Sequence, residues 1–539
     1  MALNSSLTTK QKGKIQMRKK FNDTGLCVPR LHYMADISGK ISQIVRLVEQ
    51  GEYFTINRPR QYGKTTVLSL LAKELNERRD YLVLKISFEG IGDSPFRSEQ
   101  DFCPTFLKII AQTLRPGDPD LSEYFIQASE QVHNFGDLSL FISHDVIRAG
   151  KNVVLLIDEV DKSSDNQIFL NFLGMLRNKY LLRNEEQDHT FQSVILAGVH
   201  DVKSLKAKIR PDDERKYNSP WNIAADFTVD MSLNPEEIGT MLKEYSSDKG
   251  IQPDIPAIAE KLYYYTSGYP YLVSKLCKFI DEQIVPARED KNWSVADADE
   301  AFAMIVREKY TTTLFDSMAK NLENSPDLYE NVFQIVINGK RIPFNISVPV
   351  IHLGYLYGIF TESGEYCKIH NRIFEQRIYS YMTTKLLTSE HEPLLSPQPE
   401  YYMEDGLNLR LILGKFQTFM KEHHSHKDQK FLEREGRLLF LSFLRPIING
   451  KGFEFKEPNV SDERRMDIVI TYKNRRYVLE LKRWYGPKAH QEGLQQLSDY
   501  LDMFSLREGY LLIYDFSKNR EYKQEDIVFQ NKRIFAVWV

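Results

Sequence analysis

The sequence contains few cysteines, and they form no pattern that binds a metal or builds a disulfide framework. Its 539 residues include four cysteines, which lie far apart and without a C-x-x-C pair: Cys27, Cys103, Cys277 and Cys367. This spacing argues against a zinc cluster and against a small fold held together by disulfides. It is typical of a protein in a reducing compartment.

Long hydrophobic runs are also missing. No apolar segment approaches the roughly 18 residues that a membrane-spanning helix requires, so we expect no membrane span. The basic N-terminal segment KQKGKIQMRKK lacks the apolar core of a secretory signal. Residues 1–20 are interpreted as a flexible, solvated tail, with phosphate contact as the alternative. We therefore expect a cytoplasmic protein without a membrane partner.

An excess of charge of either sign is absent too, because the formal net charge is only −3. Such a chain has no global cationic field, so any binding of nucleic acid must come from local patches. The length predicts about three or four domains, at roughly 100–200 residues for each domain.

A glycine-lysine-threonine sequence lies between a predicted strand, Tyr53–Asn57, and a helix with apolar residues at helical spacing. Free backbone N–H groups and the helix dipole at such a turn attract a polyphosphate. Gly63 lets the backbone approach the phosphates, Lys64 reaches the β- and γ-phosphates, and the Thr65 hydroxyl can ligate Mg²⁺. The segment therefore predicts a binding loop for ATP and Mg²⁺.

This loop departs from the strict pattern, because Arg58 occupies the position of the usual first glycine. The departure leaves most N–H donors in place, since they come from the last residues of the loop. The alternative is a strand-to-helix turn that binds no phosphate. The loop residues assigned to nucleotide binding are Arg60, Gln61, Gly63, Lys64, Thr65 and Thr66.

A second motif, KNVVLLIDEVDKSS, contains the apolar run Val153–Ile157 followed by two carboxylates. A continuous apolar run is typical of a strand buried on both faces of a parallel sheet. Ligands of such sheets bind at the carboxyl ends of the strands. Asp158 is therefore predicted to hold the Mg²⁺-bound water and Glu159 to polarise the attacking water. A pair of acidic turn residues is the alternative.

Two further strands are predicted over Tyr81–Gly90 and Ser193–Asp201. His200 or Asp201 ends the latter strand, where a γ-phosphate sensor can lie. A capping or solvated residue is an equal alternative at this position.

Later residues provide two weaker candidates. Arg210 or Arg215 can act as an arginine finger towards a neighbouring subunit of a homo-oligomer, or can belong to a charged surface loop. Gly268, Tyr269 and Pro270 precede an apolar helix. Pro270 and the aromatic ring can pack on adenine, or the triplet can simply start the helix.

The middle of the chain is predicted to connect two larger parts. Residues 236–320 are interpreted as a helical lid, whose first helix ends at Gly250. Residues 321–388 contain a helix, a strand-like segment SVPVIHLGYLYGIF and a turn, which together favour a winged-helix-like connector. We expect a rigid spacer, with duplex contact as the alternative. Residues 389–402 form a Pro-rich linker.

The C-terminal part, residues 403–539, contains the segment ERRMDIVITYKNRRYVLELKRW. It predicts two strands joined by the turn KNRR. Glu480 and Lys482 are two residues apart, so they share one face of the second strand. Asp467 begins the first strand, and all three side chains can therefore meet at one end of the hairpin.

Two carboxylates and a lysine in this arrangement are suited to phosphodiester cleavage. Asp467 and Glu480 offer the oxygen ligands that Mg²⁺ prefers, and the metal lowers the pKa of bound water. Lys482 orients this water or stabilises the developing oxyanion. Glu435, or else Glu433, on an upstream helix can complete the metal shell. A hairpin with alternating charges on a solvated face is the alternative.

Neighbouring residues are consistent with a nucleic-acid site. Gln496 and Tyr500 are four residues apart on a predicted helix and share one face. His490 can enter the site or belong to a surface loop. The segments ERR, KNRR and LKRWYGPK carry many cations, which can contact phosphates and make binding depend on salt. DNA is therefore the expected substrate.

Several motifs together resemble a known family. INRPRQYGKTT, LLIDEVD, FQSVILAGV, NSPWNIAADF and TSGYPYLVSKLC are similar to the AAA-like ATPases of bacteria, related to STAND-type ATPases, that carry a C-terminal PD-(D/E)XK nuclease-type domain. The resemblance extends from about residue 17 to the end. It implies that Arg58 is normal in a working phosphate loop. It also implies, more loosely, a role near the base for Gly268 and Pro270.

The expected fold is α/β and multidomain. An ATPase core with a P-loop, ASCE-type parallel sheet spans residues 21–235, and the lid and winged-helix-like connector lead to a PD-(D/E)XK α/β domain. The expected function is that of an ATP-regulated, Mg²⁺-dependent nuclease acting on DNA. Analogy with the family suggests defence against mobile genetic elements. The alternatives are a nucleotide switch whose C-terminal domain binds without cutting, and a helper ATPase of a mobile element.

Overall fold

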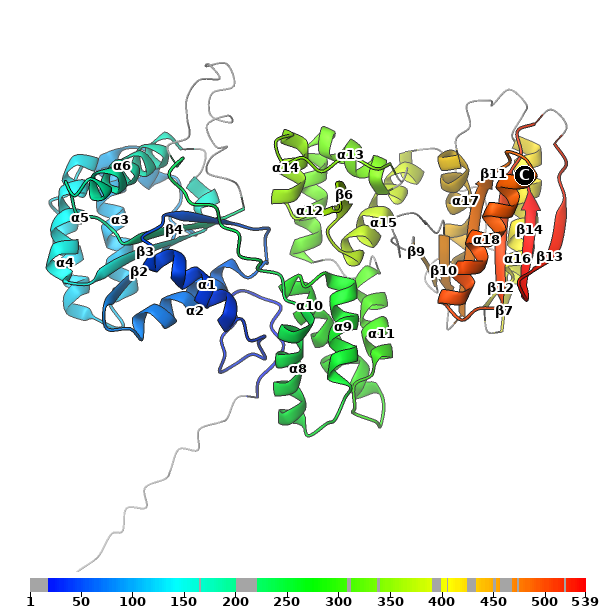
Figure 1. The fold of residues 1–539 in the computed structure, drawn as a ribbon, viewed down its shortest axis with the longest axis horizontal. Helices are drawn as coiled ribbons and strands as arrows, with labels where there is room; N and C mark the ends of the chain where they lie inside the picture. Colours follow the sequence, from blue (N-terminus) through cyan, green and yellow to red (C-terminus); the bar gives the residue numbers. More distant parts are fainter. Residues whose placement is uncertain are drawn as a thin grey trace, which may run out of the picture. The chain divides into compact units, whose positions relative to one another are not determined.

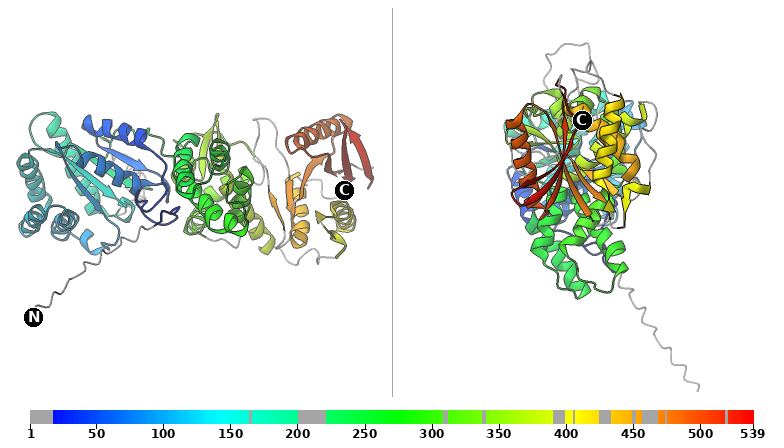
Figure 2. Two further views of the ribbon diagram at one scale, coloured as in Figure 1. Left: turned by 90° about the horizontal axis from the view of Figure 1, so that it is seen from below. Right: turned by 90° about the vertical axis from the view of Figure 1, so that its right-hand side faces the viewer.

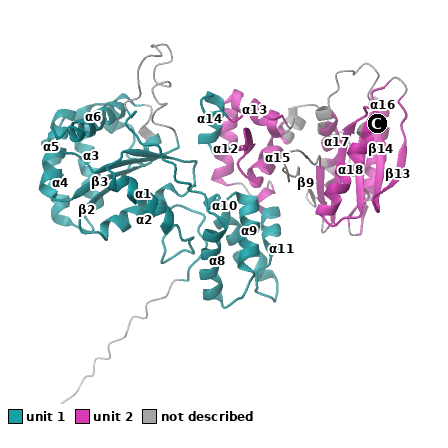
Figure 3. Cartoon of the chain, viewed as in Figure 1, with its two compact units in different colours: residues 1–304, 345–361 teal, residues 305–344, 362–539 magenta. Residues whose placement is uncertain are grey.

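The structure is a computed structural model of the chain. It describes residues 18–163, 166–199, 221–307, 312–336, 340–389, 399–404, 406–423, 433–448, 452–455, 468–472, 475–517 and 520–539. The chain forms two compact units, which Figure 3 shows in different colours. The first unit comprises residues 1–304 and 345–361, and the second comprises residues 305–344 and 362–539.

The first unit contains a parallel sheet in the order β1-β4-β3-β2 (Figure 1). Its strands are β1 (Phe54–Asn57), β2 (Tyr81–Ser87), β3 (Asn152–Asp158) and β4 (Ser193–Gly198). A parallel bridge from Phe54 to Ala225 extends the sheet beyond β1. The strand that precedes the glycine-lysine-threonine turn is thus separated by β4 from the strand that ends in Asp158. Because the strands are parallel, the candidate loop after β1 and the candidate acids after β3 both lie at the carboxyl ends of the strands.

Six helices cover the two faces of this sheet. They are α1 (Ser38–Glu49), α2 (Lys64–Asn76), α3 (Glu99–Leu114), α4 (Pro119–Ser129), α5 (Phe135–Ala149) and α6 (Gln167–Asn184). Every residue of β3 from Val153 to Asp158 is buried, as the apolar run predicts for a central parallel strand. Phenylalanines of α3 and α6 pack with this strand in one apolar core, including Phe102, Phe106 and Phe172.

The helices that follow the sheet include α8 (Pro235–Lys249), α9 (Ile255–Thr266), α10 (Pro270–Phe279) and α11 (Val295–Val306), of which α11 extends just past the boundary of the first unit. The side chain of Asn234 and that of Glu237 form a reciprocal capping box at the start of α8. The helix ends at Gly250, which is left-handed (φ 66°), where the sequence predicts the stop. Glycine adopts this conformation without the steric cost of a Cβ atom.

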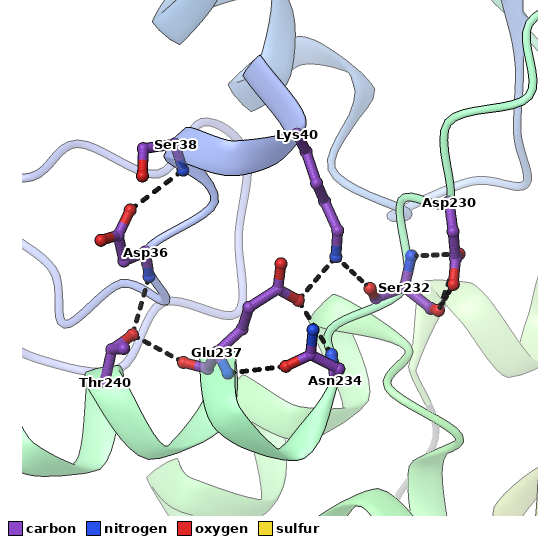
Figure 4. Close-up of polar contacts among 8 residues, drawn as sticks. All are labelled: Asp36, Ser38, Lys40, Asp230, Ser232, Asn234, Glu237 and Thr240. Atoms are coloured by element: carbon purple, nitrogen blue, oxygen red, sulfur yellow. Dashed lines mark hydrogen bonds and ion pairs between the residues drawn. The ribbon is translucent and has the colours of Figure 1, made fainter. Parts of the chain in front are cut away.

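A polar network joins the start of α1 to the start of α8 (Figure 4). Lys40 Nζ lies 2.6 Å from Glu237 Oε2 and also donates to the carbonyl of Ser232. The backbone N–H of Asp36 donates to Thr240 Oγ1 at 2.8 Å. Because the ion pair is largely buried, it is screened less by salt than a surface pair. The network fixes the first helix of the core to the first helix that follows the sheet.

Around the predicted connector, residues 321–388, lie α12 (Thr313–Glu323), most of which falls in the predicted lid, α13 (Pro326–Val336), α14 (Pro349–Leu356), β5 (Phe360–Ser363), β6 (Tyr366–Ile369) and α15 (Arg372–Ser389). The predicted pair of strands around a turn is present. The strand-like interpretation of residues 347–360 was wrong, because most of this segment is α14. Pro349 at the first helical position favours a helix, since its fixed φ is already helical and its missing N–H is not needed there.

The second unit contains a mixed six-stranded sheet in the order β13-β14-β12-β11-β10-β9. Its strands are β9 (Gly452–Phe455), β10 (Ile468–Tyr472), β11 (Arg475–Arg483), β12 (Glu508–Tyr514), β13 (Gln524–Phe529) and β14 (Lys532–Trp538). The strands β9, β10 and β11 pair antiparallel, whereas β11, β12 and β14 pair parallel. The hairpin of β10 and β11 is the one that the sequence predicts.

Helices cover both faces of this second sheet, as the end-on view in Figure 2 shows. They are α16 (Leu409–His423), α17 (Glu433–Ile448) and α18 (Pro487–Met503). Leu497 and Leu501 of α18 pack with Val478 of β11 in one core. On the other face, Tyr514 of β12 donates through its hydroxyl to the carbonyl of Gly436 in α17 at 2.5 Å. A two-stranded ribbon of β7 (Tyr402–Met403) and β8 (Gly406–Leu407) precedes α16.

Gly268 gives a test of the packing in the first unit. It is left-handed (φ +72°), and a Cβ atom there would lie 2.1 Å from the carbonyl oxygen of Leu233. We expect Gly268→Ala to destabilise the unit by roughly 1–3 kcal/mol, because both the conformation and the clash are unfavourable. Urea unfolding followed by circular dichroism measures the change.

The matched control is Gly174→Ala in the middle of α6, where nothing lies within 4 Å of the added Cβ. Alanine is favoured over glycine in a helix by about 0.5–1 kcal/mol, so this variant should be slightly more stable. An unchanged unfolding midpoint for Gly268→Ala would contradict the close approach of Leu233.

Candidate functional site

The glycine-lysine-threonine turn folds around the ammonium group of Lys64. Lys64 opens α2, and the preceding Gly63 is left-handed (φ 83°). The lysine side chain is only 7% exposed, and its Nζ donates to the carbonyls of Arg58 and Pro59 at 2.9 and 3.0 Å. The turn therefore curls over its own lysine at the start of a helix, which is the geometry of a phosphate-binding loop.

Arg58, in place of the usual first glycine, supports this loop from outside. Its guanidinium donates to the carbonyls of Asn57 and Val229 at 2.9 and 3.0 Å. It also lies 5.4 Å from the centroid of the Phe227 ring, within the range of a cation–π interaction. The arginine thus fixes the end of β1 to residues 227–229.

Two carboxylates at the end of β3 lie near Lys64. Asp158 is buried, and its Oδ1 accepts from the N–H of Glu159 at 3.0 Å. Burial raises the pKa of Glu159, and the Asp158 charge adds to this rise, whereas the Lys64 charge opposes it. Burial lowers the pKa of Lys64, while the charges of Asp161, Glu159 and Asp158 oppose the decrease. The lysine and the acids therefore form one electrostatic cluster.

Two residues of this cluster have strained backbones. Gln61 in the loop and Glu159 after β3 both have positive φ, 58° and 55°, although neither is a glycine. Such conformations cost roughly 1–3 kcal/mol and concentrate at functional sites. The strain therefore falls at the two positions where the sequence predicts nucleotide chemistry.

Asp161 is a member of the cluster that the sequence analysis missed. Its Oδ2 accepts from the N–H of Val199 at 2.6 Å, just beyond the end of β4. Its Oδ1 lies 2.8 Å from the position of a Cβ on Gly198, so only glycine fits there without a shift. Asp161 is the third acid of the segment DEVD, and this run of acids was the sequence signal that could have identified it. The hydrogen bond between Asp161 and Val199 joins the segment after β3 to the end of β4, where the sequence predicts a γ-phosphate sensor.

The turn that contains Pro270 lies against the phosphate-binding loop. A Cβ on Gly63 would be 4.0 Å from Cγ of Pro270. The hydroxyl of Tyr269 donates to the carbonyl of Arg60, and its ring meets that of Tyr62 edge to face at 4.7 Å. The structure therefore brings this turn to the loop, while contact with adenine stays a prediction.

The remaining loop residues differ in exposure. Arg60 and Gln61 are exposed, and Thr65 is half-buried in the first turn of α2. Thr66 Oγ1 accepts from the N–H of Cys27 at 3.3 Å, so this hydroxyl binds the segment before α1. A hydroxyl at Thr65 and a carboxylate at Asp158 are hard oxygen donors, which fit a Mg²⁺ ion.

In the second unit, β11 brings Glu480 and Lys482 together on the face covered by α18. Glu480 is 0% exposed, and its Oε1 lies 3.0 Å from Nζ of Lys482. Cγ of Lys482 is 3.3 Å from the position of a Cβ on Gly493 in α18. The alternative of a solvated charged face was therefore wrong, because the fold of α18 onto the sheet buries this face.

Two predicted neighbours of this site lie on α18. Gln496 Nε2 lies 3.4 Å from the hydroxyl of Tyr500, as their spacing of four residues predicts. His490 lies in α18 and not in a surface loop, with its ring 5.7 Å from Trp484 and 5.5 Å from Trp538. Burial lowers the pKa of His490. It therefore packs as an aromatic residue among the tryptophans.

Several predicted residues lie outside the described part of the chain. These are Asp467, His200, Asp201, Arg210 and Arg215, together with the side chains of Glu433 and Glu435. Among the residues that the structure describes, no group of three or more His, Cys, Asp or Glu side chains could hold a metal ion. The metal site of Asp467, Glu480 and Glu435 thus stays a prediction. None of the described helices is both long and apolar enough to cross a bilayer.

A model of the AAA-like domain matches residues 32–379, from shortly before α1 to the first half of α15. The chain belongs to the AAA-like domain family. This assignment, together with the parallel sheet and the Lys64 loop, identifies a P-loop ATPase of AAA-like type. The six-stranded sheet of the second unit lies beyond the matched residues.

The relatives of this AAA-like ATPase are distant. An uncharacterised protein in the vnfD 5′ region of Azotobacter chroococcum mcd 1 is 28% identical over 231 residues, which cover 38% of this chain and 42% of that protein. The aligned part is thus less than half of the relative.

Solved structures similar to this ATPase share little sequence with it. The Walker-type ATPase paby2304 of Pyrococcus abyssi is 11% identical, with a TM-score of 0.44 and coverage of 67% of this chain and 98% of that chain. The ORC2 protein of Aeropyrum pernix is 11% identical, with a TM-score of 0.38 and coverage of 65% and 93%. Because these scores are low, the assignment depends on the family model and on the residues described above.

Lys64→Ala tests the phosphate-binding loop. The substitution removes a charge-assisted hydrogen bond to phosphate, worth roughly 1.5–3 kcal/mol, so we expect ATP affinity to fall by about 10- to 150-fold. Fluorescence titration with a labelled ATP analogue measures the change. Lys73→Ala is the control, because Lys73 is on the same helix and its side chain is 71% exposed. Equal ATP affinity for Lys64→Ala and Lys73→Ala would show that the loop is only structural.

Proposed function

We propose that this AAA-like ATPase is an ATP-regulated, Mg²⁺-dependent nuclease that acts on DNA. The observation that carries the proposal is the pair of Glu480 and Lys482, 3.0 Å apart on β11, with the carboxylate fully buried. A buried ion pair contributes little net stability, because desolvation offsets the attraction between the charges. The presence of both charges is therefore better explained by a functional role at this position than by a contribution to stability.

The residues around this pair suit phosphodiester hydrolysis in a PD-(D/E)XK-type domain. Glu480 and Asp467, with Glu435 or Glu433, would hold Mg²⁺ through oxygen ligands. When bound, this ion supplies positive charge for the phosphoryl oxygens and lowers the pKa of water. Lys482 would donate to the attacking water or to the developing oxyanion. The cations of KNRR and LKRWYGPK would contact neighbouring phosphates.

The nucleotide site supplies the proposed regulation. Lys64 and Thr65 would hold the phosphates and Mg²⁺ with Asp158, and Glu159 would polarise the attacking water. In the first unit, a Cβ on Gly358, after α14, would lie 2.4 Å from Cγ of Pro59 in the loop. Since α14 belongs to the winged-helix-like connector, nucleotide binding at the loop would act on the segment that leads to the nuclease site. The same contact favours the spacer interpretation of the connector.

A second function is a nucleotide switch whose C-terminal domain binds nucleic acid or protein without cutting. The ion pair between Lys482 and Glu480 favours this function, because Lys482 already compensates the charge that a metal ion would otherwise offset. A role in defence against mobile genetic elements depends on analogy with the family.

Cleavage of supercoiled plasmid in Mg²⁺, with and without ATP, distinguishes the two functions. We expect the parent chain to cut, and Glu480→Gln and Lys482→Ala to lose roughly 100-fold or more of this activity. Glu492→Gln, a change of an exposed residue on α18, is the control and should cut normally. Normal cutting by Glu480→Gln would show that the site is elsewhere. A parent chain that binds DNA but never cuts it would favour the switch.

Glu159→Gln tests the role of ATP hydrolysis. The substitution keeps the shape of the side chain but removes the general base, so hydrolysis should slow roughly 100- to 10,000-fold while ATP affinity stays unchanged. Phosphate release and nucleotide titration measure the two quantities. Glu123→Gln, at an exposed position of α4, should leave both unchanged. A parental rate of phosphate release from Glu159→Gln would exclude this residue as the base.

A further inference from the structure

An exposed aromatic residue follows β11 directly after the candidate nuclease pair. Tyr485 is 72% exposed, and among the large hydrophobic residues that the structure describes only Val528 has a higher exposed fraction, 78%. Single exposed aliphatic side chains are common, but a large aromatic ring in solvent next to a candidate site is informative. Tyr485 has no role in the chemistry proposed above.

The ring is accompanied by a guanidinium group in a defined position. The Cζ atom of Arg483 lies 5.4 Å from the ring centroid of Tyr485 and 5.5 Å from that of Phe516. Phe516 in turn stacks on Tyr514, with an interplanar angle of 4°. Arg483 is paired with Tyr514 in the sheet. The arginine between two aromatic rings therefore belongs to an ordered part of the second unit.

The backbone after Tyr485 explains why the ring is exposed. Gly486 has φ +107°, and Pro487 starts α18 directly after it. A residue with a side chain rarely adopts this conformation, so glycine allows the sharp change from strand to helix. The turn ends the sheet at Tyr485 before α18 returns across the face that carries Lys482.

Tyr485 is also close to the proposed cleavage site. It lies three positions after Lys482, and an extended chain spans at most about 3.6 Å per residue. The two Cα atoms therefore lie within about 11 Å of each other, which corresponds to roughly three nucleotide steps of 3.4 Å. Lys482 faces α18, whereas Arg483, one residue on, lies on the face of Tyr514 and Phe516. The ring of Tyr485 therefore flanks the carboxyl end of β11 on the side of Arg483.

We propose that Tyr485, supported by Arg483, stacks an unpaired base of the substrate at the carboxyl end of β11, about three nucleotide steps from the scissile phosphate. This inference rests on the proposed nuclease function and specifies its substrate class as DNA with single-stranded character. An aromatic face stacks on any base, whereas a base in an intact duplex must first be unstacked and unpaired. Arg483 and the exposed Lys488 supply positive charge for the phosphates on either side.

The test is binding without cleavage. Fluorescence anisotropy in EDTA compares a labelled oligothymidylate with a duplex of equal length. Stacking on an aromatic ring is worth roughly 1–3 kcal/mol per base, so Tyr485→Ala should weaken single-strand binding by about 5- to 150-fold. Duplex affinity should stay unchanged, and Tyr485→Trp should keep single-strand binding because it retains an aromatic face.

The control is Tyr264→Ala. Tyr264 is 39% exposed in α9, with the ammonium of Lys261 at 5.4 Å from its ring, so it matches the tyrosine–cation arrangement away from the site. This variant should bind both oligonucleotides like the parent chain. Parental binding of labelled ATP and a parental circular dichroism spectrum would show that Tyr485→Ala is folded.

The possible results separate this inference from the proposed function. Single-strand affinity of Tyr485→Ala equal to that of the parent would overturn the stacking role and leave the nuclease proposal intact. An equal loss for single strand and duplex would assign Tyr485 to backbone contact and also overturn the stacking role. A parent chain that binds neither oligonucleotide would overturn the proposed function, and the stacking role with it.

Discussion

The buried ammonium group of Lys64 is the feature on which the nucleotide site depends. A charge removed from water is costly unless polar groups compensate it. Here the carbonyls of Arg58 and Pro59 accept its hydrogen bonds, and the nearby carboxylates at the end of β3 oppose the decrease in its pKa. The lysine thus holds the curled loop and the acidic strand in one arrangement, although their motifs are far apart in sequence.

Close backbone approaches attach other segments to this arrangement. Gly268 lies against Leu233, and Gly358 lies against Pro59, in both cases at distances that leave no room for a side chain. Tyr269 adds a hydrogen bond to the carbonyl of Arg60. The loop therefore directly contacts Tyr269, before α10, and Gly358, after α14. A nucleotide that displaces the loop would change both contacts.

The second unit repeats the same principle with a different ion pair. Burial of Glu480 under α18 makes its charge expensive, and Lys482 at 3.0 Å compensates it. The following turn at Gly486 ends the strand and leaves Tyr485 in solvent. One short segment thus combines a buried charged pair with an exposed aromatic ring, which in the proposed nuclease divides phosphate chemistry from base contact.

The sequence by itself determined the local features. Side-chain periodicity and turn residues act over a few positions. They predict the strand, loop and helix around Lys64, the apolar strand before Asp158 and the hairpin that contains Glu480. Only the tertiary structure decided which of them meet. Asp161 reaches Val199, and α18 buries a face that the sequence left open to solvent. These outcomes depend on contacts between residues remote in sequence, whose packing overrides local propensity.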